Sequence, residues 1–127
     1  MERTITHKVA TQHQLLKSQL ASALRAIERE GNPADLIERL ARSLELHLTL
    51  EEEHYFPRKR ADQPLLGAEI DRLVVEHADL RRHLRESAER LSEGDSRGAN
   101  AALTQFQTTF DRHERHEHDL LEGSEQT

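Results

Sequence analysis

Two segments of this chain each place a histidine, and a glutamate four residues later, in a row of apolar residues at helical spacing. In the first, His47 and Glu51 continue a row of leucines, and in the second, His113 and Glu117 follow Phe110. Residues four apart lie on one face of an α-helix, so each pair shares the face that apolar residues bury. Imidazoles and carboxylates lose their hydration on a buried face, which costs free energy unless a partner offsets it. Two such pairs therefore predict one polar site in the core at which the buried groups have partners.

The composition favours a helical fold, because Leu, Ala, Glu and Arg dominate and there are only 5 glycines and 3 prolines. Helical periodicity covers four segments, which are residues 4–30, 33–57, 64–91 and 99–120. Short connections make successive helices antiparallel, and a polar loop is expected at 92–98. We therefore predict an all-α, up-down-up-down antiparallel four-helix bundle, one domain over residues 1–127 with a short polar tail from about residue 122.

Glycine and proline mark the predicted ends of the first two helices. Gly31 is expected to cap the first helix, with Asn32 as the N-cap of the second and Pro33 at its first position. Pro57 is expected to end or sharply kink the second helix, because proline has no N–H to donate and its ring meets the preceding turn. Residues 58–63 are then predicted to form a polar connection.

The first and third helices each have a histidine in the apolar row, His13 and His77. When the two halves of the chain are aligned, His13 matches His77 and His47 matches His113, because the two histidines of each half are nearly equally far apart. Leu16 and Leu20 then match Leu80 and Leu84. This indicates a repeated helical hairpin. All four histidines and both glutamates lie at similar numbers of residues from the predicted turns, and so at similar positions along the bundle axis. They are therefore expected to meet in one layer.

Four neutral imidazoles and two carboxylates form a ligand set for two metal ions. The repeat predicts that His13, His47, His77 and His113 are shared two to each ion and that Glu51 and Glu117 bridge both. Nitrogen and oxygen ligands without sulfur suit iron, manganese or zinc. Four protein ligands per ion leave positions for a bridging oxo or hydroxo group and an external small molecule. Ligand type favours iron, although affinity alone does not exclude zinc.

Several other functional classes are disfavoured by the sequence. With no cysteine, the chain has no disulfides, thiolate ligands, iron–sulfur clusters or thiol nucleophiles. No apolar run approaches a signal peptide or the roughly 20 residues of a membrane span, so a cytoplasmic protein with no membrane partner is expected. The net charge of −6, with acidic and basic residues interleaved, argues against a nucleic-acid partner.

The chain resembles the hemerythrin-like (HHE cation-binding) family over nearly its whole length, in a pattern of His13, His47-x-x-x-Glu51, Glu76-His77 and His113-x-x-x-Glu117. This resemblance implies a four-helix bundle with a non-haem di-iron centre. Leu73 and His118 stand where the oxygen-carrying hemerythrins have a histidine and an aspartate. The chain is therefore more similar to the branch with four histidines and two bridging glutamates, which includes iron-cluster repair proteins, an iron- and oxygen-sensing ubiquitin ligase domain and small proteins linked to peroxide or nitric oxide handling.

The resemblance implies a stand-alone stress protein whose two iron ions, ferrous or ferric, bind or react with peroxide, dioxygen or nitric oxide. Catalase-like peroxide dismutation and protective iron handling both fit, and an electron donor is a further expected partner. Two alternatives stay open. One is a non-catalytic oxygen or iron sensor, and the other is a metal-free helical interaction module. The oligomeric state is not indicated.

Two residues near the predicted site have open roles. By the resemblance, Tyr55 is a candidate ligand or hydrogen-bond donor near the metals, and the alternative is a tyrosine at the bundle end with its hydroxyl in water. His54 could orient a ligand, but a solvent-facing position is favoured. The remaining histidines are predicted on the surface, namely His7, His83, His116 and His118. A solvated helix face is predicted for Glu52, Glu53, Glu76 and Glu114, with Glu76 also placed to accept a hydrogen bond from the site.

Overall fold

The computed structural model describes residues 2–29 and 33–122, which are almost entirely helical. The α-helices are α1 (Glu2–Glu28), α2 (Ala34–Leu50), α3 (Phe56–Asp62), α4 (Gly67–Ser92) and α5 (Ser96–Glu117). Shorter turns complete the chain: a π-helical turn (Glu51–Tyr55) between α2 and α3, a 3₁₀ turn (Pro64–Leu66) before α4, and a second π-helical turn (His118–Glu122) after α5.

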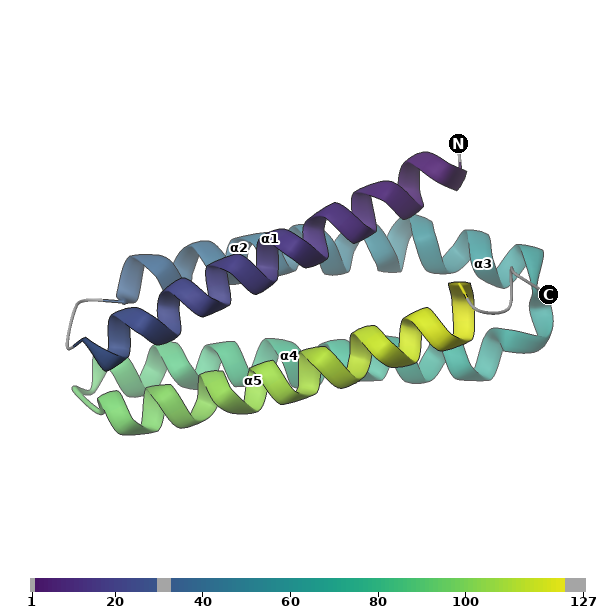
Figure 1. Cartoon of the computed structure of the whole chain (residues 1–127). Coiled ribbons are helices and arrows are strands. Elements are labelled where there is room, and N and C mark those ends of the chain that lie inside the picture. The colour runs from purple at the N-terminus through teal and green to yellow at the C-terminus, as the bar shows by residue number, and fades with distance from the viewer. Residues whose placement is uncertain (1, 30–32, 123–127) are drawn as a thin grey trace.

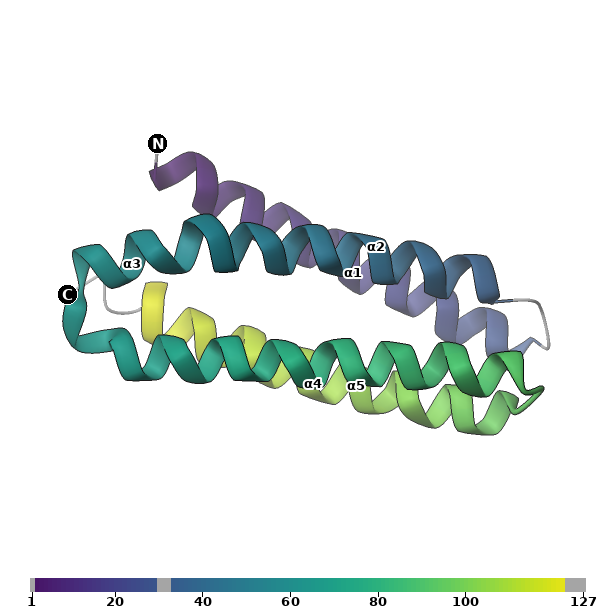
Figure 2. The ribbon, with the colours of Figure 1, turned by 180° about the vertical axis from the view of Figure 1, so that it is seen from behind.

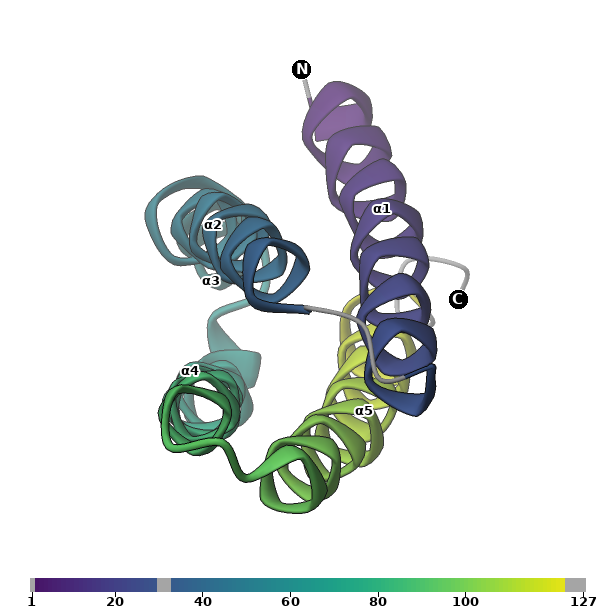
Figure 3. The same ribbon diagram turned by 90° about the vertical axis from the view of Figure 1, so that its left-hand side faces the viewer.

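The helices form an antiparallel four-helix bundle, as the sequence predicts. One of the four long helices is α2 continued through the π-helical turn into α3, and the other three are α1, α4 and α5 (Figure 1). Seen from behind, this composite helix runs unbroken along α4 (Figure 2). The end view places the four helices at the corners of a square, with α1 beside α2 and α5, and α4 beside α2 and α5 (Figure 3).

Pro57 does not end the second helix, so that prediction is wrong. The N–H of Phe56 donates to the carbonyl of Glu51, five residues back, which closes a π turn directly before the proline. In a regular α-helix the ring of Pro57 would meet the carbonyl of Glu53, and the wider π turn gives it room. The helix therefore continues to Asp62, and most of the predicted 58–63 connection is α3.

The other boundaries lie close to the predicted ones. α2 begins at Ala34 with Pro33 directly before it, whereas the predicted caps Gly31 and Asn32 lie outside the described residues. The predicted polar tail is helical as far as Glu122, and the remainder of it also lies outside them.

The connection between α4 and α5 is shorter than the predicted 92–98 loop. Gly94 has a φ of 80°, a conformation that glycine adopts without strain. The side chain of Asp95 accepts a hydrogen bond from the N–H of Gly98 at 2.8 Å and so caps α5. The cap starts the helix at Ser96 and leaves only 93–95 between the two helices.

The bundle interior holds two apolar clusters with a polar layer between them. The larger cluster, near the α4–α5 connection, comprises Leu16, Leu20, Ala23, Ile37, Leu40, Leu44, Leu48, Leu80, Leu84, Leu103, Phe106 and Phe110. The smaller one, near α3, comprises Val9, Tyr55, Phe56, Ile70 and Leu73. On α1 and α4, His13 and His77 fall between residues of the two clusters, and on the composite helix Glu51 falls between Leu48 and Tyr55. The apolar clusters therefore enclose the polar layer along the bundle axis.

Although Glu51, Lys59 and Glu117 are buried, the outward faces of the helices carry most of the charged residues. Examples are the ion pairs of Arg42 with Glu38 at 3.1 Å and of Arg60 with Asp71 at 2.7 Å. Among the described residues, no helix combines the length and apolar character needed to cross a membrane.

The burial pattern predicts that replacing two leucines of α2 by alanine lowers the free energy of unfolding by unequal amounts. Leu44 is 1% exposed in the larger cluster, whereas Leu46 is 69% exposed. Leu44→Ala should lower the free energy of unfolding by about 2–5 kcal/mol, because it leaves a cavity in the core. Leu46→Ala, the same change on the same helix, should alter it by less than about 0.5 kcal/mol. Urea unfolding measures both values, and equal effects would contradict the core described above.

Candidate metal centre

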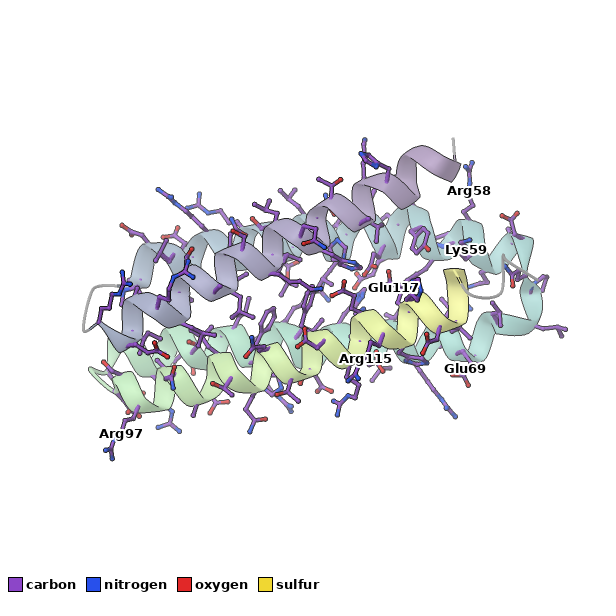
Figure 4. The ribbon with its side chains drawn as sticks, viewed as in Figure 1. Arg58, Lys59, Glu69, Arg97, Arg115 and Glu117 are labelled. Carbon is purple, nitrogen blue, oxygen red and sulfur yellow. The ribbon has the colours of Figure 1, made fainter. Side chains whose placement is uncertain are left out.

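The six residues predicted to form one layer are buried together in the bundle. The exposed fraction is 0% for His47, Glu51 and His77, 1% for His113 and Glu117, and 7% for His13. The side chain of Glu117 points from α5 into the bundle, whereas Arg97 at the start of the same helix points away from it (Figure 4). All four long helices contribute to this layer.

Glu51 lies at the centre of the layer. Its Oε1 is 3.0 Å from Nε2 of His77 and 3.8 Å from Nε2 of His113, and its Oε2 is 3.5 Å from Nε2 of His47. The donor atoms of His13, His47 and Glu51 lie within 4.8 Å of one another, as do those of Glu51, His77 and His113. Glu51 thus belongs to two potential metal sites, which indicates a binuclear centre.

The histidine rings are paired within the two groups. The ring centroids of His13 and His47 are 4.5 Å apart, and those of His77 and His113 are 4.9 Å apart. Glu117 lies beside the second pair, with its Oε2 at 3.4 Å from Nε2 of His113.

Several buried polar atoms of this layer have no hydrogen-bond partner within the described part of the chain. They are Nε2 of His13, His47 and His113, and Oε2 of Glu51 and Glu117. A buried polar atom left without a partner costs on the order of 1–3 kcal/mol, and native proteins rarely tolerate several in one place. Cations bound among these atoms would accept their lone pairs, so the donor set fits a metal centre.

Each imidazole directs its other nitrogen, Nδ1, at a side-chain oxygen of a neighbouring helix. The distances are 2.8 Å for His47 to Gln12, 2.6 Å for His77 to Glu52, 2.6 Å for His113 to Glu76 and 3.5 Å for His13 to Glu114. The first three contacts are hydrogen bonds to oxygens that only accept, so Nδ1 is the donor there, whereas the contact of His13 is longer than a usual hydrogen bond. In the neutral ring the lone pair is then on Nε2, which faces the centre of the layer, as in histidines that bind metals.

The outer carboxylates correct one prediction. Glu52, Glu76 and Glu114 are partly buried and face site histidines, so they do not form a solvated helix face, whereas Glu53 is exposed as predicted. The predicted hydrogen bond to Glu76 is confirmed, and its donor is His113. Gln12 was not singled out, although the repeat could have found it, because it precedes His13 as Glu76 precedes His77.

Two of the outer carboxylates are themselves held in place. Arg81 donates to Glu52 at 3.2 Å and to Glu45 at 2.7 Å. Nδ1 of His116 lies 3.1 Å from the second oxygen of Glu76. His116 therefore has a partner in this network and is only partly exposed, contrary to the predicted surface position.

His83 is also buried, at 9% exposed, because α5 packs against that side of α4. His7 and His118 are exposed, as predicted.

Tyr55 is 1% exposed and its hydroxyl is buried, so the alternative of a hydroxyl in water is wrong. The Nζ of Lys59 is 5.7 Å from the Tyr55 ring centroid, and Lys59 is itself 1% exposed although it was predicted in a polar connection. Both belong to the end of the bundle near α3. His54 is exposed, as favoured from the sequence. Phe56 stacks on the ring of His77, with centroids 5.5 Å apart.

Burial and neighbouring charges separate the pKa values within the layer. Burial, together with His47, lowers the pKa of His13 to about 3, so this ring is neutral at pH 7. Burial also opposes charge on His113, but the adjacent carboxylates of Glu117, Glu51 and Glu76 outweigh it and raise that pKa to about 11. Metal binding to His113 must therefore displace a proton.

The two central carboxyls of the metal-free protein are not equivalent. Burial and the negative charge of Glu51 raise the pKa of Glu117 well above its usual value. Burial acts in the same direction on Glu51, but hydrogen bonding by its neighbours outweighs it and lowers that pKa well below its usual value. Without metal, Glu51 carries the negative charge of the pair, since like charges this close disfavour double ionisation.

Comparison with known proteins gives one match. A family model described as "Hemerythrin HHE cation binding domain" matches residues 4–122. Among curated proteins and among solved structures, none matches the chain.

The low pKa of His13 predicts how the metal-free protein responds to acid. Between pH 6.5 and about 3 the unfolded chain protonates this imidazole and the folded protein does not, so stability falls as the pH falls through that range. His13→Gln removes this proton uptake. The variant should lose less stability on acidification, by up to about 1.4 kcal/mol per pH unit. Urea unfolding of the metal-free proteins at several pH values between about 7 and 5 tests this, and identical slopes would refute it.

Proposed function

Because the chain belongs to the hemerythrin HHE cation-binding domain family, we propose that it holds two iron ions with which it binds or reacts with a small oxidant or gas. Peroxide, dioxygen and nitric oxide are the proposed ligands, and protection against oxidative or nitrosative stress is the proposed role. The observation that carries the proposal is the buried layer in which unpartnered histidine nitrogens converge on two carboxylates.

The proposed ligand assignment follows the two donor groups. His13 and His47 would hold one ion, and His77 and His113 the other. Glu51 belongs to both groups and would bridge the ions. Glu117, beside His113 at the same height, would be the second bridge. These six residues give each ion two nitrogen and two oxygen ligands, a set without sulfur that suits iron.

The chain's own residues prepare this site in three ways. The outer oxygens hold the imidazoles in the orientation that presents Nε2 to the centre. The negative charge of Glu51, together with that of Glu117 once metal displaces its proton, offsets the positive charge of two cations. The two apolar clusters exclude water along the bundle axis. When bound, an iron pair would supply one-electron redox chemistry and a coordination position for a small molecule.

The bridging role of Glu51 predicts a change in metal content. Glu51→Gln keeps the size of the side chain but removes its charge, so the variant should bind fewer than two irons per chain and lose the spectrum of the wild-type centre. Glu53→Gln, the same change two residues away on an exposed side chain, should leave both unchanged. Iron analysis with absorption spectroscopy measures the effect, and circular dichroism checks that both variants fold. Two irons and an unchanged spectrum in Glu51→Gln would contradict the assignment.

The reaction of the iron-loaded protein with hydrogen peroxide distinguishes a catalytic role from a sensing role. Iron-loaded protein should consume hydrogen peroxide faster than protein treated with a chelator, and an oxygen electrode shows whether dioxygen is released, as dismutation requires. If the iron-loaded protein binds nitric oxide or dioxygen but consumes no peroxide, the sensor is the better assignment. If chelation changes neither stability nor helix content and no iron is found, the protein is a metal-free helical module.

A further inference from the structure

A groove lies between α2 and α4, toward the end of the bundle where α2 begins and α4 ends (Figure 2). Its volume is about 600 Å³, within the range of roughly 300–1,000 Å³ that is typical of small-molecule sites. The six residues of the metal layer, all of which the structure describes, are not part of its lining. This α2–α4 groove is therefore a feature distinct from the proposed metal centre.

The floor of the groove is apolar. Ile37, Leu44 and Leu84 belong to the larger core cluster, and Ala41 and Leu91 pack against that cluster while only partly buried. A hydrocarbon chain in the groove would lie against these side chains and leave contact with water, which is favourable. The groove therefore fits a ligand with an apolar body.

Three alanines leave this space open. Ala34 and Ala41 of α2 and Ala88 of α4 line the groove between larger apolar side chains on the adjacent turns. A longer side chain at any of these positions would extend into the space between the two helices, whereas an alanine side chain ends at its β-carbon. The open space therefore follows from the residues that the sequence places along this seam.

The groove is elongated along the helices. Its lining spans residues 34–45 on α2 and 81–92 on α4, which at about 1.5 Å per residue corresponds to a length of about 16 Å. An extended chain fits this shape better than a compact ring system.

The charges at the rim leave one arginine without a partner. Arg81 is paired with Glu45 at 2.7 Å, and Glu38 is paired with Arg42 at 3.1 Å. Arg85 also lines the groove, and it forms no ion pair or hydrogen bond with the part of the chain that the structure describes. Its guanidinium is therefore available to an anionic group of a ligand.

We propose that the α2–α4 groove binds one molecule of a fatty acid, with the hydrocarbon chain along the apolar floor and the carboxylate paired with Arg85. The carboxyl of a fatty acid is ionised at pH 7, and a guanidinium can donate two parallel hydrogen bonds to a carboxylate. Side chains on a helix lean toward its N-terminus, so we expect the guanidinium of Arg85 to lie toward the Arg81 end of the groove. The chain then has the length of the groove as far as Leu91.

Calorimetric titration of the protein with dodecanoate, at concentrations below those at which it forms micelles, tests the inference. We expect one bound molecule per chain. Each methylene removed from the ligand should weaken binding by about 4-fold, because each one buries a similar apolar area against the floor. Octanoate should therefore bind far more weakly than dodecanoate.

Filling the groove provides the first matched pair of variants. Ala88→Leu places a larger side chain in the groove and should weaken dodecanoate binding by at least about 10-fold, because it occupies the space of several ligand methylenes. Ala78→Leu makes the same change at an exposed position of the same helix, outside the groove, and should leave binding unchanged.

Removing the charge provides the second pair. Arg85→Gln should weaken dodecanoate binding by about 5-fold, the size expected for an ion pair at a partly exposed site. Arg82→Gln removes the same charge from an exposed side chain of α4 that does not line the groove, so it should have no effect. Circular dichroism checks that all four variants fold, and if one groove variant does not, the other decides.

Three outcomes would overturn the inference. One is the absence of dodecanoate binding, and another is binding that Ala88→Leu and Arg85→Gln leave unchanged. The third is a groove that a second copy of the chain covers, which sedimentation would show as a dimer that Ala88→Leu disrupts. Because no ligand of the proposed metal centre lines the groove, each of these outcomes would leave the proposed function standing.

Discussion

The structure depends on one constraint, which is that six ionisable side chains lie in the core of a small helical bundle. Removing such groups from water is expensive unless each has a partner. Three of the four imidazoles are hydrogen-bonded on their outer side to oxygens of neighbouring helices, and a carboxylate oxygen of Glu51 lies 3.0 Å from the inner nitrogen of His77. The remaining inner atoms have no protein partner within the described chain, so most outer nitrogens are hydrogen-bonded while several atoms at the centre of the layer are not. Two cations bound at the centre would give the unpartnered inner atoms the partners that the protein does not supply.

The π-helical turn is part of the same solution. Glu51 is its first residue and Tyr55 its last, and both are buried, one in the polar layer and the other in the apolar cluster beside it. A wider turn rotates the direction in which every later side chain points around the helix axis. Phe56 accordingly stacks on His77, and Lys59 lies inside the bundle. π-turns often occur at functional sites. Here the turn joins the helix that carries His47 and Glu51 to the segment that closes the end of the layer.

Much of this arrangement could be predicted from the sequence, because it rests on periodicity. Apolar residues at helical spacing, interrupted by His13, His47, His77 and His113, predict both the bundle and the residues that meet in it. The effect of Pro57 could not be predicted in the same way, because the choice between a helix end and a π turn depends on what the next turn can pack against. Apart from Glu76, the outer partners could not be predicted, because long side chains such as those of Glu52 and Gln12 reach across helices and their targets are known only once the helices are placed. The repeat alone indicates that Gln12 and Glu76 have equivalent positions, because each directly precedes one of two equivalent histidines.

The central claim is that the buried layer holds two iron ions. Anomalous diffraction at the iron absorption edge, from crystals of protein purified without added metal, tests it most directly. We expect two anomalous peaks inside the bundle, one between His13 and His47 and one between His77 and His113, with Glu51 next to both. An interior without anomalous signal, or peaks confined to the protein surface, would contradict it.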